Sequence, residues 1–63
     1  MSEQELIQKS YEQSIQELYK TFYDTFTFAL GDLGQEQQAQ NRFRVGIEHA
    51  KHVRDLALSL LED

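Results

Sequence analysis

Two histidines one helical turn apart are the residues of this chain whose types and spacing could support chemistry. His49 and His52 form an H-x-x-H pattern, and on a helix residues three apart lie on the same side. Two such imidazoles can share a metal ion, with Glu17 on a facing helix as a candidate third ligand. A small metal-binding four-helix bundle is therefore one hypothesis. Because paired or solvent-exposed interface histidines are the commoner arrangement, we expect no bound metal and no cofactor.

Catalytic patterns are absent from the sequence. It has no cysteine, no glycine-rich phosphate loop and no G-x-S-x-G nucleophile elbow. Its serines lie within segments of helical periodicity, and a chain of two helices offers no deep pocket of its own. We therefore expect the protein not to be an enzyme.

Length and composition set the class of protein. A chain of 63 residues forms one small domain with a marginal core, and such domains commonly depend on disulfides, metals or oligomerisation. The net charge of −5 disfavours nucleic acid and anionic membranes as main partners, because both attract basic surfaces. No apolar segment approaches the length that spans a bilayer. The polar start, MSEQEL, does not resemble a secretory signal, so we expect a cytoplasmic location.

An apolar stripe from Ile7 to Leu33 organises the first half of the chain. Its members recur every three or four residues, which predicts one long helix from about residue 3 to 30. Ser2 and Glu5 have the spacing of a capping box and mark the start of this helix. The sequence has no proline, so nothing interrupts the helix before Gly31.

The second half is expected to form the partner helix. Residues 31–34, Gly-Asp-Leu-Gly, are the turn signal, with Asp32 as the cap of a helix over about residues 35–61. The prediction is an all-α, antiparallel two-helix hairpin that forms a single domain over residues 1–63. Its predicted core consists of Ile7, Tyr11, Ile15, Leu18, Phe22, Phe26, Phe43, Ile47, Ala50, Val53 and Ala57.

Arg54 interrupts the apolar stripe of the second helix. If the hairpin folds about Leu33, residues whose numbers add up to about 66 face each other. That register predicts an ion pair between Arg54 and Glu12, or an arginine that extends its guanidinium to the edge of the interface.

A second apolar stripe on the second helix predicts self-association. Its members recur at helical spacing on a different face, and a lone hairpin has nothing to cover them. Two hairpins packed as a four-helix bundle would cover them, so we expect a homodimer. The predicted interface consists of Val45, His49, His52, Leu56 and Leu60.

In outline the chain resembles small acidic helical hairpins that dimerise, such as the Rop family of plasmid RNA regulators and the hairpin co-chaperones of bacterial secretion systems. The resemblance lies in length, charge and helix order. We expect a non-enzymatic interaction protein, an adaptor or regulator that binds a protein partner through a helix face as a homodimer. An RNA-binding hairpin dimer of the Rop kind is the alternative from a different class, although basic residues interleaved with Glu48 and Asp55 disfavour it.

Overall fold

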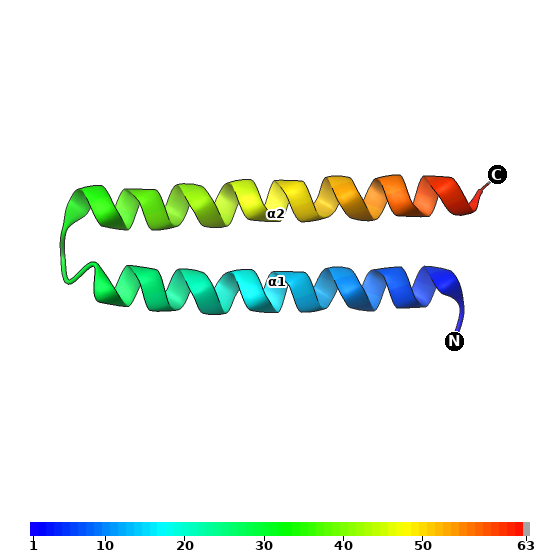
Figure 1. Cartoon of the computed structure of the whole chain (residues 1–63), viewed down its shortest axis with the longest axis horizontal. Helices are drawn as coiled ribbons and strands as arrows, with labels where there is room; N and C mark the ends of the chain where they lie inside the picture. Colours follow the sequence, from blue (N-terminus) through cyan, green and yellow to red (C-terminus); the bar gives the residue numbers. More distant parts are fainter. Residues whose placement is uncertain (63) are drawn as a thin grey trace.

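The computed structural model describes residues 1–62 as two antiparallel helices that lie side by side (Figure 1). Helix α1 spans Glu3–Phe28 and helix α2 spans Leu33–Leu61. The start of α1 and the end of α2 lie at the same end of the hairpin, opposite the turn (Figure 1). The predicted all-α helical hairpin is thus confirmed. No helix in the described part of the chain is long and apolar enough to cross a membrane.

Side-chain caps define where both helices begin. The Ser2 hydroxyl accepts a hydrogen bond from the Glu5 backbone N–H at 3.1 Å, and Asp32 Oδ1 accepts one from the Gln35 N–H at 3.1 Å. Each cap satisfies a backbone donor that the first helical turn leaves without a partner. Because Asp32 is the cap, α2 begins at Leu33, two residues before the predicted start.

The turn lies two residues earlier than the sequence predicted. It runs over residues 29–32, because Leu30 (φ +52°) and Gly31 (φ +85°) both adopt the left-handed conformation and end α1 at Phe28. The Asp32 N–H then donates to the Ala29 carbonyl at 2.9 Å. Leu33 therefore does not continue the stripe of the first helix. It is the first residue of α2 and remains 75% exposed.

Alanine substitution at the two turn glycines should have opposite effects. A side chain at Gly31 is strained at φ +85°, so Gly31→Ala is expected to lower the free energy of unfolding by about 1–2 kcal/mol. Gly34 lies in the first turn of α2, where Gly34→Ala should be neutral or stabilising through helix propensity. Urea denaturation followed by circular dichroism measures both. Equal effects of the two substitutions would contradict the assigned turn.

Three contacts fix the register of the hairpin. Leu18 packs against Gly46, the rings of Phe22 and Phe43 stack with centroids 5.0 Å apart, and the Arg54 guanidinium lies 4.4 Å from the centroid of the Tyr11 ring. The numbers of facing residues thus add up to 64 or 65.

The predicted pair between Arg54 and Glu12 does not form. One step in the register moves the facing position on α1 by a third of a helical turn, to the face of Tyr11. Arg54 is held there by a cation–π contact and by an ion pair with its neighbour Asp55 at 3.0 Å.

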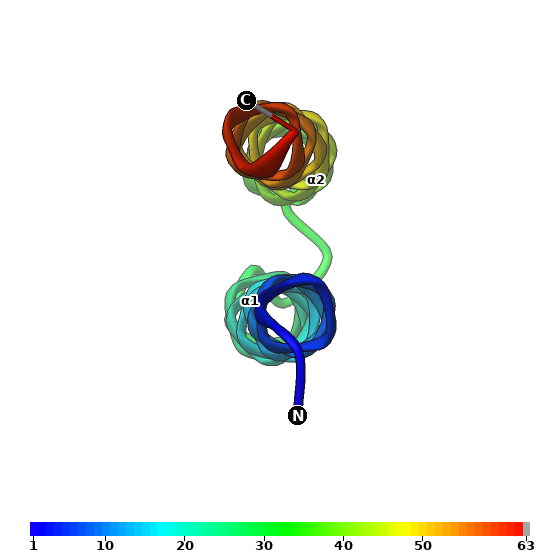
Figure 2. The ribbon, with the colours of Figure 1, turned by 90° about the vertical axis from the view of Figure 1, so that its right-hand side faces the viewer.

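The hairpin is a single layer with little interior. Its Cα atoms extend 48 × 18 × 6 Å, and the end-on view shows two helices with nothing on either side of their common plane (Figure 2). Among residues 1–62 only Ala29 and Ala39, near the turn, are buried. Nine of the eleven predicted core residues are half-buried. The other two, Phe26 and Val53, are 36% and 49% exposed, because they lie at the edges of the helix contact.

Candidate functional site

An open groove of about 730 Å³ runs along one face of the hairpin, between the first half of α1 and the second half of α2. We call this side the groove face. Small side chains form much of the lining, which leaves the space between the two helices unfilled; they are Ser10, Ser14, Thr21, Gly46, Ala50 and Ala57. Leu6 and Val53 add larger apolar side chains, and Glu17 and His49 add polar ones. A shallower hollow of about 70 Å³, which Arg42 helps to line, continues toward the turn.

Gly46 sets the depth of the groove. A Cβ built on Gly46 would lie 2.5 Å from Cδ2 of Leu18. The leucine side chain therefore occupies the space that any other residue would need. The absence of a side chain at this position lets α1 and α2 approach closely, and the cost in helix propensity, about 1 kcal/mol, is offset by that contact.

The two serine hydroxyl groups in the groove form hydrogen bonds within α1. Ser10 Oγ donates to the Leu6 carbonyl at 2.9 Å, and Ser14 Oγ donates to the Ser10 carbonyl at 3.0 Å. Such bonds to the preceding helical turn satisfy the hydroxyl hydrogens. The serines thus behave as small residues, and the groove presents a largely apolar surface.

The three candidate metal ligands are not gathered into one site. Glu17 and His49 both line the groove, but His52 does not. In the part of the chain that the structure describes, no group of three or more His, Cys, Asp or Glu side chains could hold a metal ion.

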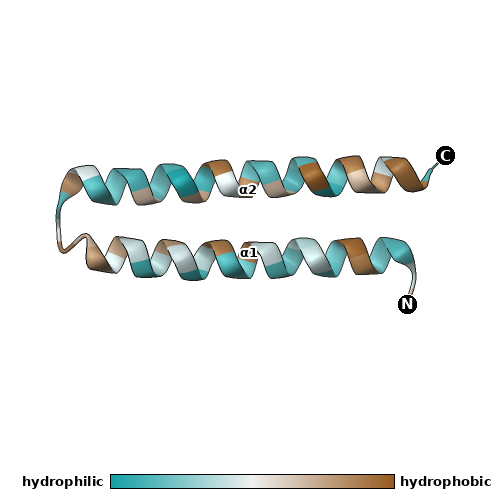
Figure 3. Ribbon diagram, in the orientation of Figure 1, coloured by the Kyte–Doolittle hydropathy of each residue, from teal (hydrophilic) through white to brown (hydrophobic). Residues whose placement is uncertain are grey.

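The predicted interface stripe on α2 is solvent-exposed in the hairpin. Val45, Leu56 and Leu60 are 61%, 54% and 65% exposed, and both histidines are exposed. Of these five residues His49 alone lines the groove. Figure 3 shows the same distribution: hydrophobic segments recur along both helices and are not confined to the sides on which α1 and α2 face each other.

Aromatic side chains outside the groove form a second exposed surface on α1. The rings of Tyr19 and Tyr23 lie with centroids 6.4 Å apart, and these residues are 57% and 60% exposed. Phe26 adjoins Phe22, with ring centroids 5.6 Å apart. None of Tyr19, Tyr23 and Phe26 lines the groove. We call these three residues the aromatic patch.

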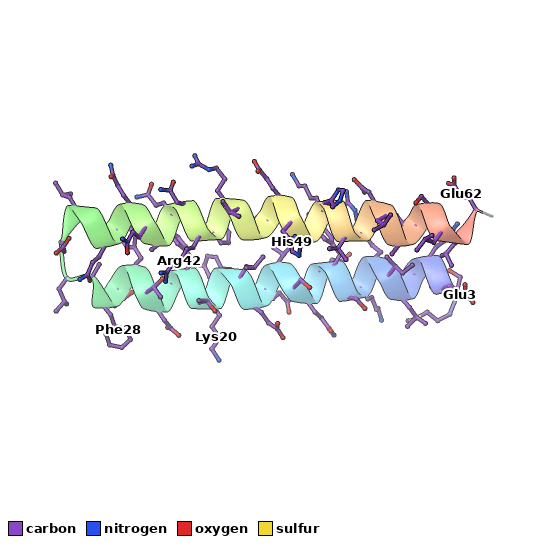
Figure 4. The ribbon with its side chains drawn as sticks, turned by 45° about the horizontal axis from the view of Figure 1, so that its top comes forward. Glu3, Lys20, Phe28, Arg42, His49 and Glu62 are labelled. Atoms are coloured by element: carbon purple, nitrogen blue, oxygen red, sulfur yellow. The ribbon has the colours of Figure 1, made fainter. Side chains whose placement is uncertain are left out.

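Basic side chains lie on more than one side of the hairpin. Arg42 and His49 lie between the two ribbons, whereas Lys20 and Phe28 point away from α2 (Figure 4). Arg44 donates to Asn41 Oδ1 at 2.7 Å. At 100° per residue Arg44 and Arg42 lie on different sides of α2, and Lys51 lies on the side of Arg44. Glu48 and Asp55 share that side, so acidic groups are interleaved with the basic ones there, which disfavours a phosphate-tracking surface.

Sequence reasoning missed the α1 side of the groove. Leu6, Ser10 and Ser14 lie beside the main stripe. Because the two serines are polar, these three positions do not form an apolar pattern in the sequence. A weaker signal was present on α2, where a 4, 3, 4, 3, 4, 3 spacing places seven small or apolar residues on one seam: Ala39, Phe43, Gly46, Ala50, Val53, Ala57 and Leu60. Such heptad spacing is typical of helices in bundles.

Comparisons with models of protein families, with curated proteins and with solved structures gave no match for this chain. Its function is therefore argued from the groove, the aromatic patch and the exposed surface.

Proposed function

We propose that the chain is a non-enzymatic interaction protein, an adaptor or regulator, that acts as a homodimer and binds a protein partner through an exposed helix face. The observation that carries this proposal is the surface area. The hairpin exposes 5218 Å², whereas a folded monomer of this mass exposes about 4,200 Å². The excess of about 1,000 Å² is close to the roughly 800 Å² that each partner buries in a standard protein interface.

The composition of the exposed surface supports protein as the partner. Exposed side chains include large apolar residues on both helices and at the turn, such as Tyr23, Phe28 and Leu60. Apolar surface of this extent is typical of interaction sites. The aromatic patch matches the enrichment of Tyr and Phe at protein interfaces, which makes it the candidate surface for a partner other than a second copy.

Two measurements test this proposal. Sedimentation equilibrium of the purified chain should give twice the mass of one chain, 7.4 kDa, and a monomer at all concentrations would contradict the homodimer. An affinity capture should retain a protein partner with the wild type and lose it with Tyr19→Ala/Tyr23→Ala. The double variant is expected to remain dimeric, because both side chains lie outside the groove.

A control variant separates the aromatic patch from the remaining exposed apolar surface. Leu33 is 75% exposed at the opposite side of the turn, and Leu33→Ala is expected to retain the partner. Equal loss of the partner with both variants would move the binding surface away from the aromatic patch.

A further inference from the structure

We infer that a second copy of this chain covers the groove face, with the turns of the two hairpins at the same end, so that α1 of each copy packs against α2 of the other. This inference rests on the proposed homodimer and adds its geometry. A second copy is the occupant that the exposed area favours, since the excess of about 1,000 Å² matches one side of a standard interface.

Charge distinguishes the two sides of the groove. On α1, Glu17 lines the groove, and Asp24 follows seven residues later, at nearly the same angle around the helix; we call this pair the acidic flank. On α2, His49 lines the groove and Arg42, seven residues earlier, lines the hollow that continues it; we call this pair the basic flank. Glu17 and His49 border the groove on its α1 and α2 sides, whereas Asp24 lies beyond its lining, on the same side of α1 as Glu17.

The flanks are not paired with each other within one hairpin. Among residues 1–62 the ion pair present is the one between Arg54 and Asp55, so Glu17, Asp24 and Arg42 reach no opposite charge within bonding distance. Figure 4 shows Arg42 and His49 between the ribbons on α2, where a neighbouring chain seated on the groove face would meet them. The flanks are therefore free to pair with a second copy.

A twofold axis parallel to the helices brings complementary residues together. Such an axis sets α1 of one copy against α2 of the other and leaves every residue at its own height along the bundle. Because facing residues have numbers that add up to about 65, Glu17 then meets His49 of the second copy and Asp24 meets Arg42. Acidic groups thus face basic ones, each contact occurring twice.

The alternative twofold arrangement lacks this match. An axis perpendicular to the helices sets α1 against α1 and α2 against α2, with the turns at opposite ends. Heights are also inverted about the middle of each helix, so only the residues near mid-helix come close to their own copies: Glu17 then lies near Glu17 of the second copy, and His49 near His49. The same inversion brings Asp24 near the apolar end of α1 at Leu6 and Ile7. Like charges and a carboxylate against leucine disfavour this dimer.

Spin-label distances test the geometry directly. The chain has no cysteine, so Gln37→Cys, at an exposed position near the turn, carries one label per copy. With the turns together we expect a separation below about 25 Å, given helix spacings of about 8–10 Å. With the turns apart the separation would exceed about 30 Å, because Gln37 lies near the turn end of α2 and the two labels would be separated by about twenty residues of helix at a rise of 1.5 Å per residue. Glu48→Cys, near the middle of α2, is the control, because its label separation is short in either dimer.

Charge reversal tests the contacts. Glu17→Lys/Asp24→Lys should raise the dissociation constant of the dimer at least about tenfold, since it opposes like charges. Adding Arg42→Glu/His49→Glu to the same chain should restore the wild-type value to within about threefold. Glu12→Lys/Glu48→Lys changes the net charge equally, away from the groove, and should leave the constant nearly unchanged.

The outcomes separate this inference from the proposed function. A dimer whose Gln37 labels lie more than about 30 Å apart, or whose affinity is the same with the acidic flank reversed, overturns the geometry and leaves the homodimer standing. A wild-type chain that stays monomeric overturns both.

Discussion

Replacing Phe22 with alanine is expected to lower the free energy of unfolding by about 3 kcal/mol. Phe22 is the centre of the aromatic contacts between the helices: its ring stacks on Phe43 at 5.0 Å and lies 5.6 Å from Phe26. Truncation removes both contacts and leaves a gap beside Ala39, one of the two buried residues. We place the loss near the lower end of the range for buried phenylalanine, because Phe22 is half-buried.

A loss of this size is a large part of the free energy of unfolding of a native domain, which is about 5–15 kcal/mol. Phe22→Ala should therefore show a much lower melting temperature and partial helix loss at room temperature, as measured by circular dichroism at fixed protein concentration. Tyr23→Ala is the matched control, since the neighbouring ring is 60% exposed and should cost less than about 1 kcal/mol. If both variants melt within a few degrees of the wild type, Phe22 does not anchor the hairpin.

Helix caps were predictable because they depend on local chemistry. The capping residues Ser2 and Asp32 each bond to an N–H three residues on, and that pattern is visible in the sequence without any knowledge of the fold. The position of the turn was less predictable, and with it the start of α2. The predicted turn, residues 31–34, holds two glycines, but the left-handed conformation lies at Gly31 and at Leu30, and leucine rarely adopts it.

The register and the groove depend on how the two helices pack against each other. The sequence gives only a weak indication of that packing. The predicted register differed from the observed one by one residue. It therefore placed Glu12 beside Arg54, whereas the actual neighbour is Tyr11. The groove arises because Leu18 fills the space above Gly46 while the serines beside it are too small to fill theirs. Neither fact follows from an apolar stripe, since a stripe marks the side of a helix that packs and not the space left between two packed sides.

Two apolar surfaces on α2 therefore compete as the dimer interface: the predicted outer stripe, which includes Val45, and the groove, which includes Val53. The same substitution at these two residues decides between them. Val53→Glu is expected to raise the dissociation constant of the dimer at least about tenfold, because a carboxylate in the covered groove would lose most of its water among apolar neighbours. These neighbours include Ala50, Ala57 and the apolar side of α1; His49 and Arg54 are the basic groups of the lining, and they keep the expected loss from being larger.

Val45→Glu is the matched control, because Val45 is 61% exposed and does not line the groove. We expect its dimer to dissociate at nearly the wild-type concentration. Sedimentation velocity over a dilution series measures both variants, and circular dichroism on the same samples should show Val53→Glu losing helix on dilution, since a single hairpin has so little buried interior. The reverse result, in which Val45→Glu dissociates and Val53→Glu does not, would assign the interface to the outer stripe of Val45, His49, His52, Leu56 and Leu60 and leave the groove open for another partner.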